Sequence, residues 1–156
     1  MPYFTYDTSV IISRKLIAPP ARTSNFLMSA VVLMELSASA RDKSELKIYQ
    51  GLFRDYQRDK SLIASNEDDW LLASKVLYWL AQGRRRVRRG RLPRLAPGVS
   101  QRLALDALIA TSARRWKATV VTKNWNDFAA IRRFCNVKVL KASAFFKYKL
   151  GGGNDR

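Results

Sequence analysis

The chain has 156 residues, 47% of them apolar, and this composition predicts one folded domain with a sizeable core and argues against a disordered chain. Its 29 Lys and Arg residues outnumber its 12 Asp and Glu residues, and the net charge of +17 predicts a polyanionic partner, with nucleic acid ahead of an acidic protein or a membrane surface. The absence of histidine excludes Ser-His-Asp and Cys-His catalytic systems as well as histidine metal sites.

The first half of the chain predicts short strands followed by helices. The predicted elements are a strand over 3–7, a turn at Thr8 and Ser9, a loop over 19–23, a short strand over 25–28, and helices over 30–40, 42–58 and 66–82. The strand over 3–7 is rich in β-branched and aromatic residues, whereas the helices carry apolar side chains at helical spacing. Ser29 and Asn66 are expected to cap the helices that follow them, and Gly83 is expected to end the third helix.

The second half opens with an arginine-rich segment, 83–98, whose proline and glycine residues predict a loop. The elements expected after it are a helix capped by Ser100 and running to about Trp116, a strand over 118–124, a helix over 125–134 and a strand over 137–140. This order predicts an α/β sandwich around a mainly parallel sheet. One domain is expected over 1–148, with a loose tail over 149–156.

Two further features bear on the compartment. The single cysteine, Cys135, excludes an internal disulfide and is expected to be a small core residue. The longest apolar run, 26–36, is interrupted by Ser29 and Glu35, and the first residues lack the pattern of a signal peptide. We therefore expect a cytoplasmic protein that does not span a membrane.

Four of the acidic residues lie in apolar surroundings, whereas the other eight lie in polar runs or helix caps and are expected at the surface. The four are Asp7, Glu35, Asp106 and Asp127. Each has an ordinary alternative: a cap for Asp7 and Asp127, a pair with Arg102 for Asp106, and solvent contact for Glu35. Buried carboxylates are costly and repel one another, and a divalent cation removes that cost. The four acids together therefore suggest a site for Mg²⁺ or Mn²⁺.

Four segments, "YDTSVII", "SAVVLMEL", "LALDALIATSA" and "TKNWNDF", resemble in order and spacing the PIN-domain nucleases, and most of all the VapC-type ribonuclease toxins of toxin–antitoxin pairs. The resemblance covers about residues 3–140. It implies a three-layer α/β/α sandwich with a mainly parallel central sheet. It also implies Mg²⁺- or Mn²⁺-dependent hydrolysis of RNA phosphodiester bonds, a homodimer, and inhibition by a cognate antitoxin.

By matched motif, the resemblance assigns Asp7, Glu35 and Asp106 as catalytic, metal-binding acids. Asp127 matches the fourth acid, although Asn124 could share its place. The polar residues expected to support these acids are Thr8, Ser9, Thr122 and Asn124.

The RNA backbone is expected to contact the arginine-rich segment. The arginines assigned to this role are Arg84, Arg85, Arg86, Arg88, Arg89 and Arg91. Trp125 could stack an unpaired base, and a half-buried packing role fits it equally well. Two other hypotheses stay open: a catalytically inactive PIN-fold module that binds RNA, and a basic protein whose main role is to bind an acidic protein partner.

Overall fold

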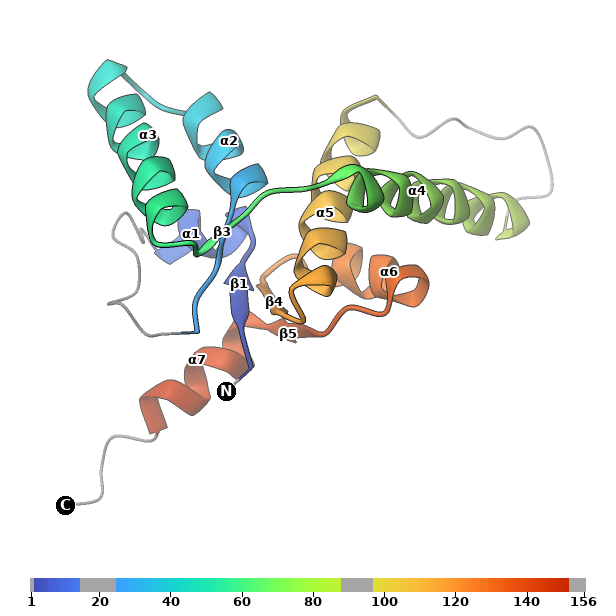
Figure 1. Cartoon of the computed structure of the whole chain (residues 1–156). Helices are drawn as coiled ribbons and strands as arrows, with labels where there is room; N and C mark the ends of the chain where they lie inside the picture. Colours follow the sequence, from blue (N-terminus) through green and yellow to red (C-terminus); the bar gives the residue numbers. More distant parts are fainter. Residues whose placement is uncertain (1, 15–24, 88–96, 152–156) are drawn as a thin grey trace.

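The structure is a computed structural model and describes residues 2–14, 25–87 and 97–151. Its elements, drawn in Figure 1, are β1 (Phe4–Tyr6), α1 (Thr8–Arg14), β2 (Met28–Ser29), α2 (Ala30–Ala38), α3 (Lys43–Arg58), β3 (Leu62–Ile63), α4 (Glu67–Val87), α5 (Pro97–Arg115), β4 (Thr119–Thr122), α6 (Trp125–Cys135), β5 (Val139–Lys141) and α7 (Ala142–Gly151). The mixture of short strands and intervening helices confirms the predicted α/β class.

The central sheet is parallel, with the strand order β1-β4-β5. Strands β2 and β3 form a second parallel pair, and a bridge between Phe4 and Phe26 places the chain leading into β2 beside β1. Tyr6 pairs with Val121, and Thr122 pairs with Lys141. The carboxyl ends of β1, β4 and β5 therefore meet at one edge of the sheet, where parallel α/β folds bind their ligands.

Helices cover the sheet on both sides. Phe4 and Tyr6 are two residues apart, so they point to the same face, where their rings pack against Phe145 of α7 at 5.1 and 5.9 Å between ring centroids. Helices α5 and α6 cover the opposite face (Figure 1). Val120 and Val121 of β4 are both fully buried, as expected for a strand covered on both faces.

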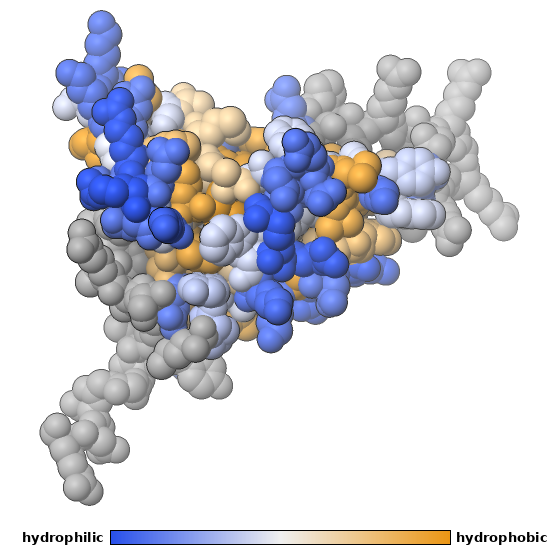
Figure 2. Space-filling view, in the orientation of Figure 1, coloured by the Kyte–Doolittle hydropathy of each residue, from blue (hydrophilic) through white to orange (hydrophobic). Residues whose placement is uncertain are grey.

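Helix α5 is buried on most of its sides, because it contacts α4, α6, α2 and β4. This position explains the nearly continuous apolar sequence around Asp106. Helix α3, in contrast, buries only Tyr49 and Tyr56, and hydrophilic side chains gather on its outer face at the upper left of Figure 2. No helix in the described part of the chain is long and apolar enough to cross a membrane.

Several predicted boundaries are wrong. The expected turn at Thr8 and Ser9 is the start of helix α1. Helix α4 does not end at Gly83 and continues to Val87, since arginine is a good helix former and one glycine costs only about 1 kcal/mol. Helix α5 begins at Pro97, which suits the first turn of a helix, and not after a cap at Ser100. The predicted loop over 83–98 is therefore wrong for residues 83–87 and 97–98, which are helical, and residues 88–96 lie outside the described residues.

Two predicted caps differ in their hydrogen bonding. Asn66 Oδ1 accepts a hydrogen bond of 3.0 Å from the Asp69 N–H, which confirms the predicted cap. Ser29 occupies the predicted N-cap position of α2 without a capping hydrogen bond from its side chain.

Strand β3 and helix α7 are absent from the elements that the sequence predicts. Helix α7 includes residues 149–151, which the sequence assigns to a tail. Residues 152–156 lie outside the described residues.

Candidate functional site

Asp7 follows β1 directly and is only 2% exposed. One carboxylate oxygen accepts hydrogen bonds from Ser9 Oγ at 2.7 Å and from the Val10 N–H at 3.2 Å. The other accepts one from Thr122 Oγ1 at 2.6 Å. Burial raises the pKa of Asp7, and the hydrogen bonds from Thr122, Ser9 and Val10 oppose that rise. The two predicted polar residues Ser9 and Thr122 thus hold the carboxylate from both sides.

Asp106 lies in the middle of α5 and is 7% exposed. Its burial, followed by the charges of Asp7, Asp127 and Glu35, raises its pKa to about 7, while Arg102 opposes this rise. The three other predicted acids are therefore close enough to Asp106 to influence its ionisation.

The ordinary alternative for Asp106, an ion pair with Arg102, is not what the structure shows. Arg102 Nε lies 3.4 Å from Asp127 Oδ2 instead, in an ion pair that is partly open to solvent. None of the ion pairs formed by the described residues includes Asp7 or Asp106. Both acids are therefore buried without forming an ion pair in that part of the chain.

Asn124 connects the acids on α5 and α6. Its side-chain amide donates to Asp127 Oδ2 at 2.8 Å and to Asp106 Oδ2 at 3.2 Å, and its backbone N–H donates to Thr122 Oγ1 at 2.8 Å. Asn124 and Asp127 therefore both lie beside Asp106, and which of the two would serve as the fourth ligand stays a prediction. On the α1 side, Thr8 Oγ1 donates a hydrogen bond to Glu35 Oε2, so Thr8 also lies beside a predicted acid.

The oxygen atoms at this site suit a divalent cation in type. Carboxylate oxygens without nitrogen or sulfur ligands are the set that Mg²⁺ and Mn²⁺ prefer. Within the described ranges, however, no three acids meet closely enough to form a ready metal-binding group. Hydroxyl and amide donors from Thr8, Ser9, Thr122 and Asn124 occupy the carboxylates instead.

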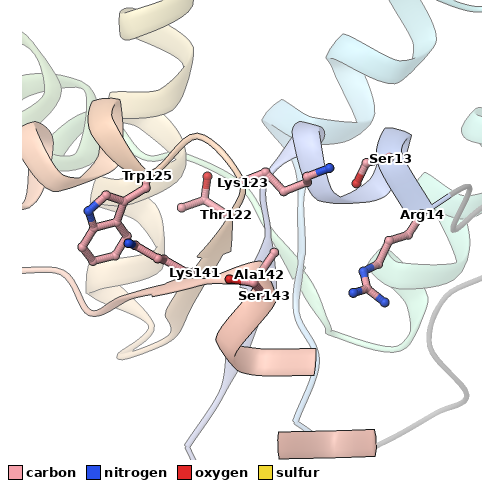
Figure 3. Close-up of a pocket in the computed structure, with 8 residues that line it drawn as sticks. All are labelled: Ser13, Arg14, Thr122, Lys123, Trp125, Lys141, Ala142 and Ser143. Atoms are coloured by element: carbon pink, nitrogen blue, oxygen red, sulfur yellow. The ribbon is translucent and has the colours of Figure 1, made fainter. Parts of the chain in front are cut away.

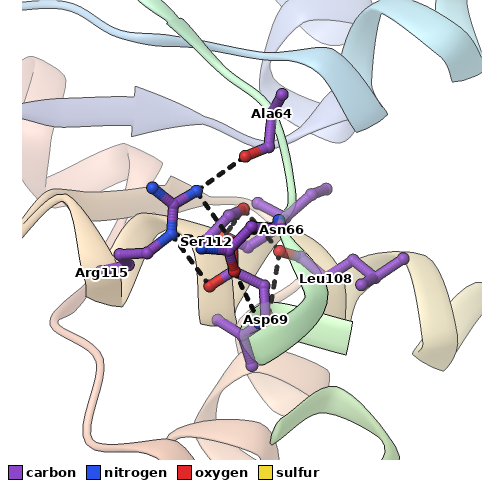
Figure 4. Close-up of polar contacts among 8 residues, drawn as sticks. Ala64, Asn66, Asp69, Leu108, Ser112 and Arg115 are labelled. Atoms are coloured by element: carbon purple, nitrogen blue, oxygen red, sulfur yellow. Dashed lines mark hydrogen bonds and ion pairs between the residues drawn. The ribbon is translucent and has the colours of Figure 1, made fainter. Parts of the chain in front are cut away.

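A buried acid elsewhere shows what a purely structural arrangement looks like in this protein. Asp69 is 3% exposed, although the sequence predicts it at the surface. Its carboxylate accepts hydrogen bonds from Arg115 Nη2 at 2.9 Å and Nε at 3.0 Å, and Arg115 also donates to the Ala64 carbonyl (Figure 4). Asp69 therefore has a cation fully engaged with it, in contrast to Asp7 and Asp106.

A cavity of about 640 Å³ adjoins the acids at the same edge of the sheet (Figure 3). Its lining residues are Ser13, Arg14, Thr122, Lys123, Trp125, Lys141, Ala142 and Ser143. Of these, sequence reasoning identifies only Thr122 and Trp125. It misses Arg14, Lys123 and Lys141 because they come from three separate segments. The one signal in the sequence is that Lys123 and Lys141 each lie at or just beyond the end of a strand.

Trp125 is half-buried, and its ring contacts cations. Arg132 Cζ and Lys141 Nζ each lie 5.1 Å from the centroid of the ring. These contacts favour the packing interpretation of Trp125, although the ring also lines the cavity.

The arginine-rich segment lies mostly beyond the described residues. Arg88, Arg89 and Arg91 are outside them, and Arg84, Arg85 and Arg86 are described only as part of the backbone of α4. Their assignment to RNA stays a prediction.

Several solved structures share this arrangement of helices and strands, whereas no curated protein matches the chain. DNA-bound VapBC from Salmonella typhimurium is 18% identical, with a TM-score of 0.59 over 91% of this chain and 99% of that one. VapBC2 from Rickettsia felis, bound to a promoter DNA fragment, is 18% identical, with a TM-score of 0.56 over 89% and 98%. FitAcB from Neisseria gonorrhoeae is 16% identical, with a TM-score of 0.51 over 90% and 98%.

These likenesses concern the fold. The family is shown by sequence, because the model of the PIN domain matches residues 5–133, which include all four predicted acids. The resemblance that the motifs predict is therefore confirmed, and the chain belongs to the PIN domain family.

Proposed function

We propose that the protein is a divalent-metal-dependent endoribonuclease and acts as the toxin of a toxin–antitoxin pair. The observation that carries this proposal is the setting of Asp106. It is a buried carboxyl group without an ion-pair partner among the described residues, and its pKa is raised by burial and by the charges of Asp7, Asp127 and Glu35. Perturbed pKa values are concentrated at functional sites, and a bound cation would offset the repulsion among these like charges.

Asp7, Glu35, Asp106 and Asp127 would hold Mg²⁺ or Mn²⁺. When bound, such an ion neutralises charge on the phosphate and activates water for attack on phosphorus. The remaining residues orient the acids. Thr122 and Ser9 fix the carboxylate of Asp7, Thr8 fixes Glu35, and the amide of Asn124 sets the distance between Asp106 and Asp127.

RNA is the proposed substrate because the chain is strongly basic, with a net charge of +17. Backbone contacts are assigned to Arg84, Arg85, Arg86, Arg88, Arg89 and Arg91, and Trp125 is a further candidate. An antitoxin partner is proposed because the chain shares its fold with VapBC and FitAcB. We also propose that the protein forms a homodimer and is located in the cytoplasm.

The test is cleavage of single-stranded RNA with Mn²⁺ or Mg²⁺, compared with cleavage in chelator. Cleavage should need the metal, and Asp7→Asn, Glu35→Gln and Asp106→Asn should each lower the rate by about two orders of magnitude or more. Asp68→Asn is the matched control, because it removes the same charge from an exposed position in the first turn of α4.

Equal cleavage with and without chelator would contradict the metal mechanism. Wild-type cleavage by Asp106→Asn would contradict the assignment of the site. RNA binding without any cleavage would favour the inactive RNA-binding module instead.

A further inference from the structure

The cavity beside the acids extends along the sheet edge from the end of α1 to the end of β5. Thr122 belongs both to the group of acids and to the cavity, since its hydroxyl donates to Asp7 at 2.6 Å and the residue itself lines the cavity. Thr122 pairs in register with Lys141 of β5. Neighbouring strands are about 4.8 Å apart. Asp7, Thr122 and Lys141 therefore follow one another along this edge, one per strand, with their backbones about one strand spacing apart.

The charged residues around this cavity are cations. Arg14, Lys123 and Lys141 line it, and none of the ion pairs formed by the described residues involves any of the three. In Figure 3, Lys123 extends toward Ser13 on one side, while Lys141 lies beside Trp125 on the other. The cavity therefore presents positive charge from α1, β4 and β5 without a carboxylate among its described lining residues.

Aromatic rings hold two of these cations in place. Arg14 Cζ lies 3.4 Å from the centroid of the Phe146 ring, and Lys141 Nζ lies 5.1 Å from that of Trp125. Such contacts orient a cation without neutralising its charge, so the charge stays available to an anion.

The lining of the cavity also includes neutral donors. Ala142 and Ser143 line it as the first two residues of α7, and the N–H groups at the start of a helix point away from the helix toward an anion. The Ser143 hydroxyl also lines the cavity, whereas the Ser13 hydroxyl, which lines it from α1, donates to the Val10 carbonyl at 3.1 Å. Cations, hydroxyl groups and helix N–H groups together are the donors that bind phosphate oxygens.

We propose that this cavity binds a phosphate of the RNA backbone next to the one that is cleaved at the acids. The proposal rests on the proposed function, because it takes the acids as the point of cleavage. The cavity would then set the path of the RNA strand across the sheet edge, between the cations near the end of β5 and the carboxylates around Asp7. Binding there would be independent of base sequence.

The test uses two double variants with the same change in charge on the same two strands. Lys123→Gln with Lys141→Gln removes the cations at the carboxyl ends of β4 and β5. Lys117→Gln with Lys138→Gln removes exposed lysines at the amino ends of those strands, away from the cavity. Binding of oligouridylate in chelator is measured against salt concentration, and cleavage with Mn²⁺ is measured separately.

The cavity variant should bind oligouridylate about tenfold more weakly than the control variant. Its log–log salt slope should be flatter by about 0.7 for each phosphate that the variant no longer neutralises. Its KM for RNA should rise in proportion, while its kcat at saturating RNA stays close to that of the control. Equal slopes and affinities for the two variants would overturn the proposal.

A second probe, oligoglutamate of equal length, separates RNA from an acidic protein tail. Loss of oligoglutamate binding with unchanged RNA binding would assign the cavity to a protein partner and overturn the proposal. Failure of the wild-type protein to cleave with any metal would overturn the proposed nuclease instead. A wild-type protein that cleaves, with two double variants of equal KM, would leave the nuclease standing and remove only this phosphate site.

Discussion

Asp106 combines two surroundings that both disfavour its charge, burial in α5 and the nearby acids, and its pKa rises from 3.8 to about 7. The folded protein therefore holds this proton more tightly than the unfolded chain does. The free energy of unfolding should fall as pH rises from about 4 to about 7, because the folded protein must then carry a charge that the unfolded chain carries more easily.

Asp106→Asn removes this penalty. In chelator, the variant should be more stable than wild type at about pH 8, and its advantage should shrink at about pH 5, where the wild-type carboxyl group is protonated. Urea unfolding at the two pH values measures the difference, with Asp68→Asn as the control that lacks such a pH-dependent gain. A variant that is less stable than wild type at both pH values would assign Asp106 a structural role.

Single residues also show how far sequence alone can identify the site. Asp7 can be recognised because it follows a predicted buried strand, and Glu35 and Asp106 because their immediate neighbours are apolar, which are local signals. Asp69 cannot, because its burial depends on Arg115, 46 positions away in the chain. The cations around the cavity escape sequence reasoning for the same reason, since only the parallel register brings Lys141 beside Thr122.

At the scale of elements, the contact between Asp69 and Arg115 joins the start of α4 to the end of α5. Arg115→Met should destabilise the protein by about 2 kcal/mol, because it leaves the Asp69 carboxylate buried without its charged donor. Arg115→Met combined with Asp69→Asn should recover part of the loss. Chemical unfolding of the two single variants and the double variant measures this coupling, and additive effects would contradict it.

The length and periodicity of an element decide whether the sequence can predict it. Helix α3 is predicted to within one residue because its apolar side chains follow the helical period and Asp42 caps it. Strand β3 spans Leu62–Ile63, too short a stretch for any alternation to show. Helix α7 is amphipathic only weakly in sequence, and its aromatic residues are placed by packing against Tyr6. Such tertiary contacts override local preference.

For the whole molecule, metal binding should appear as added stability. At a hundredfold excess of Mn²⁺ over its dissociation constant, the wild-type protein should gain about 2–3 kcal/mol, because only the folded chain brings the four acids together. Asp106→Asn should gain much less. Melting curves with Mn²⁺ and with chelator measure both gains, and equal gains would place the ion elsewhere on the protein.

Helix α5 has a consequence for how the site can change shape. Ala107, Ala110 and Ala113 are fully buried along one stripe of it, so the helix is in close contact with its neighbours and has no room to slide or tilt. Asp106 is thus anchored to a tightly packed helix. Any closing of the acids around a ligand must come from the periphery, through rotamers of Glu35 and Asp127 and the turn at Asn124. We therefore expect the position of Asp106 to stay the same when a ligand binds, while the side chains around it move.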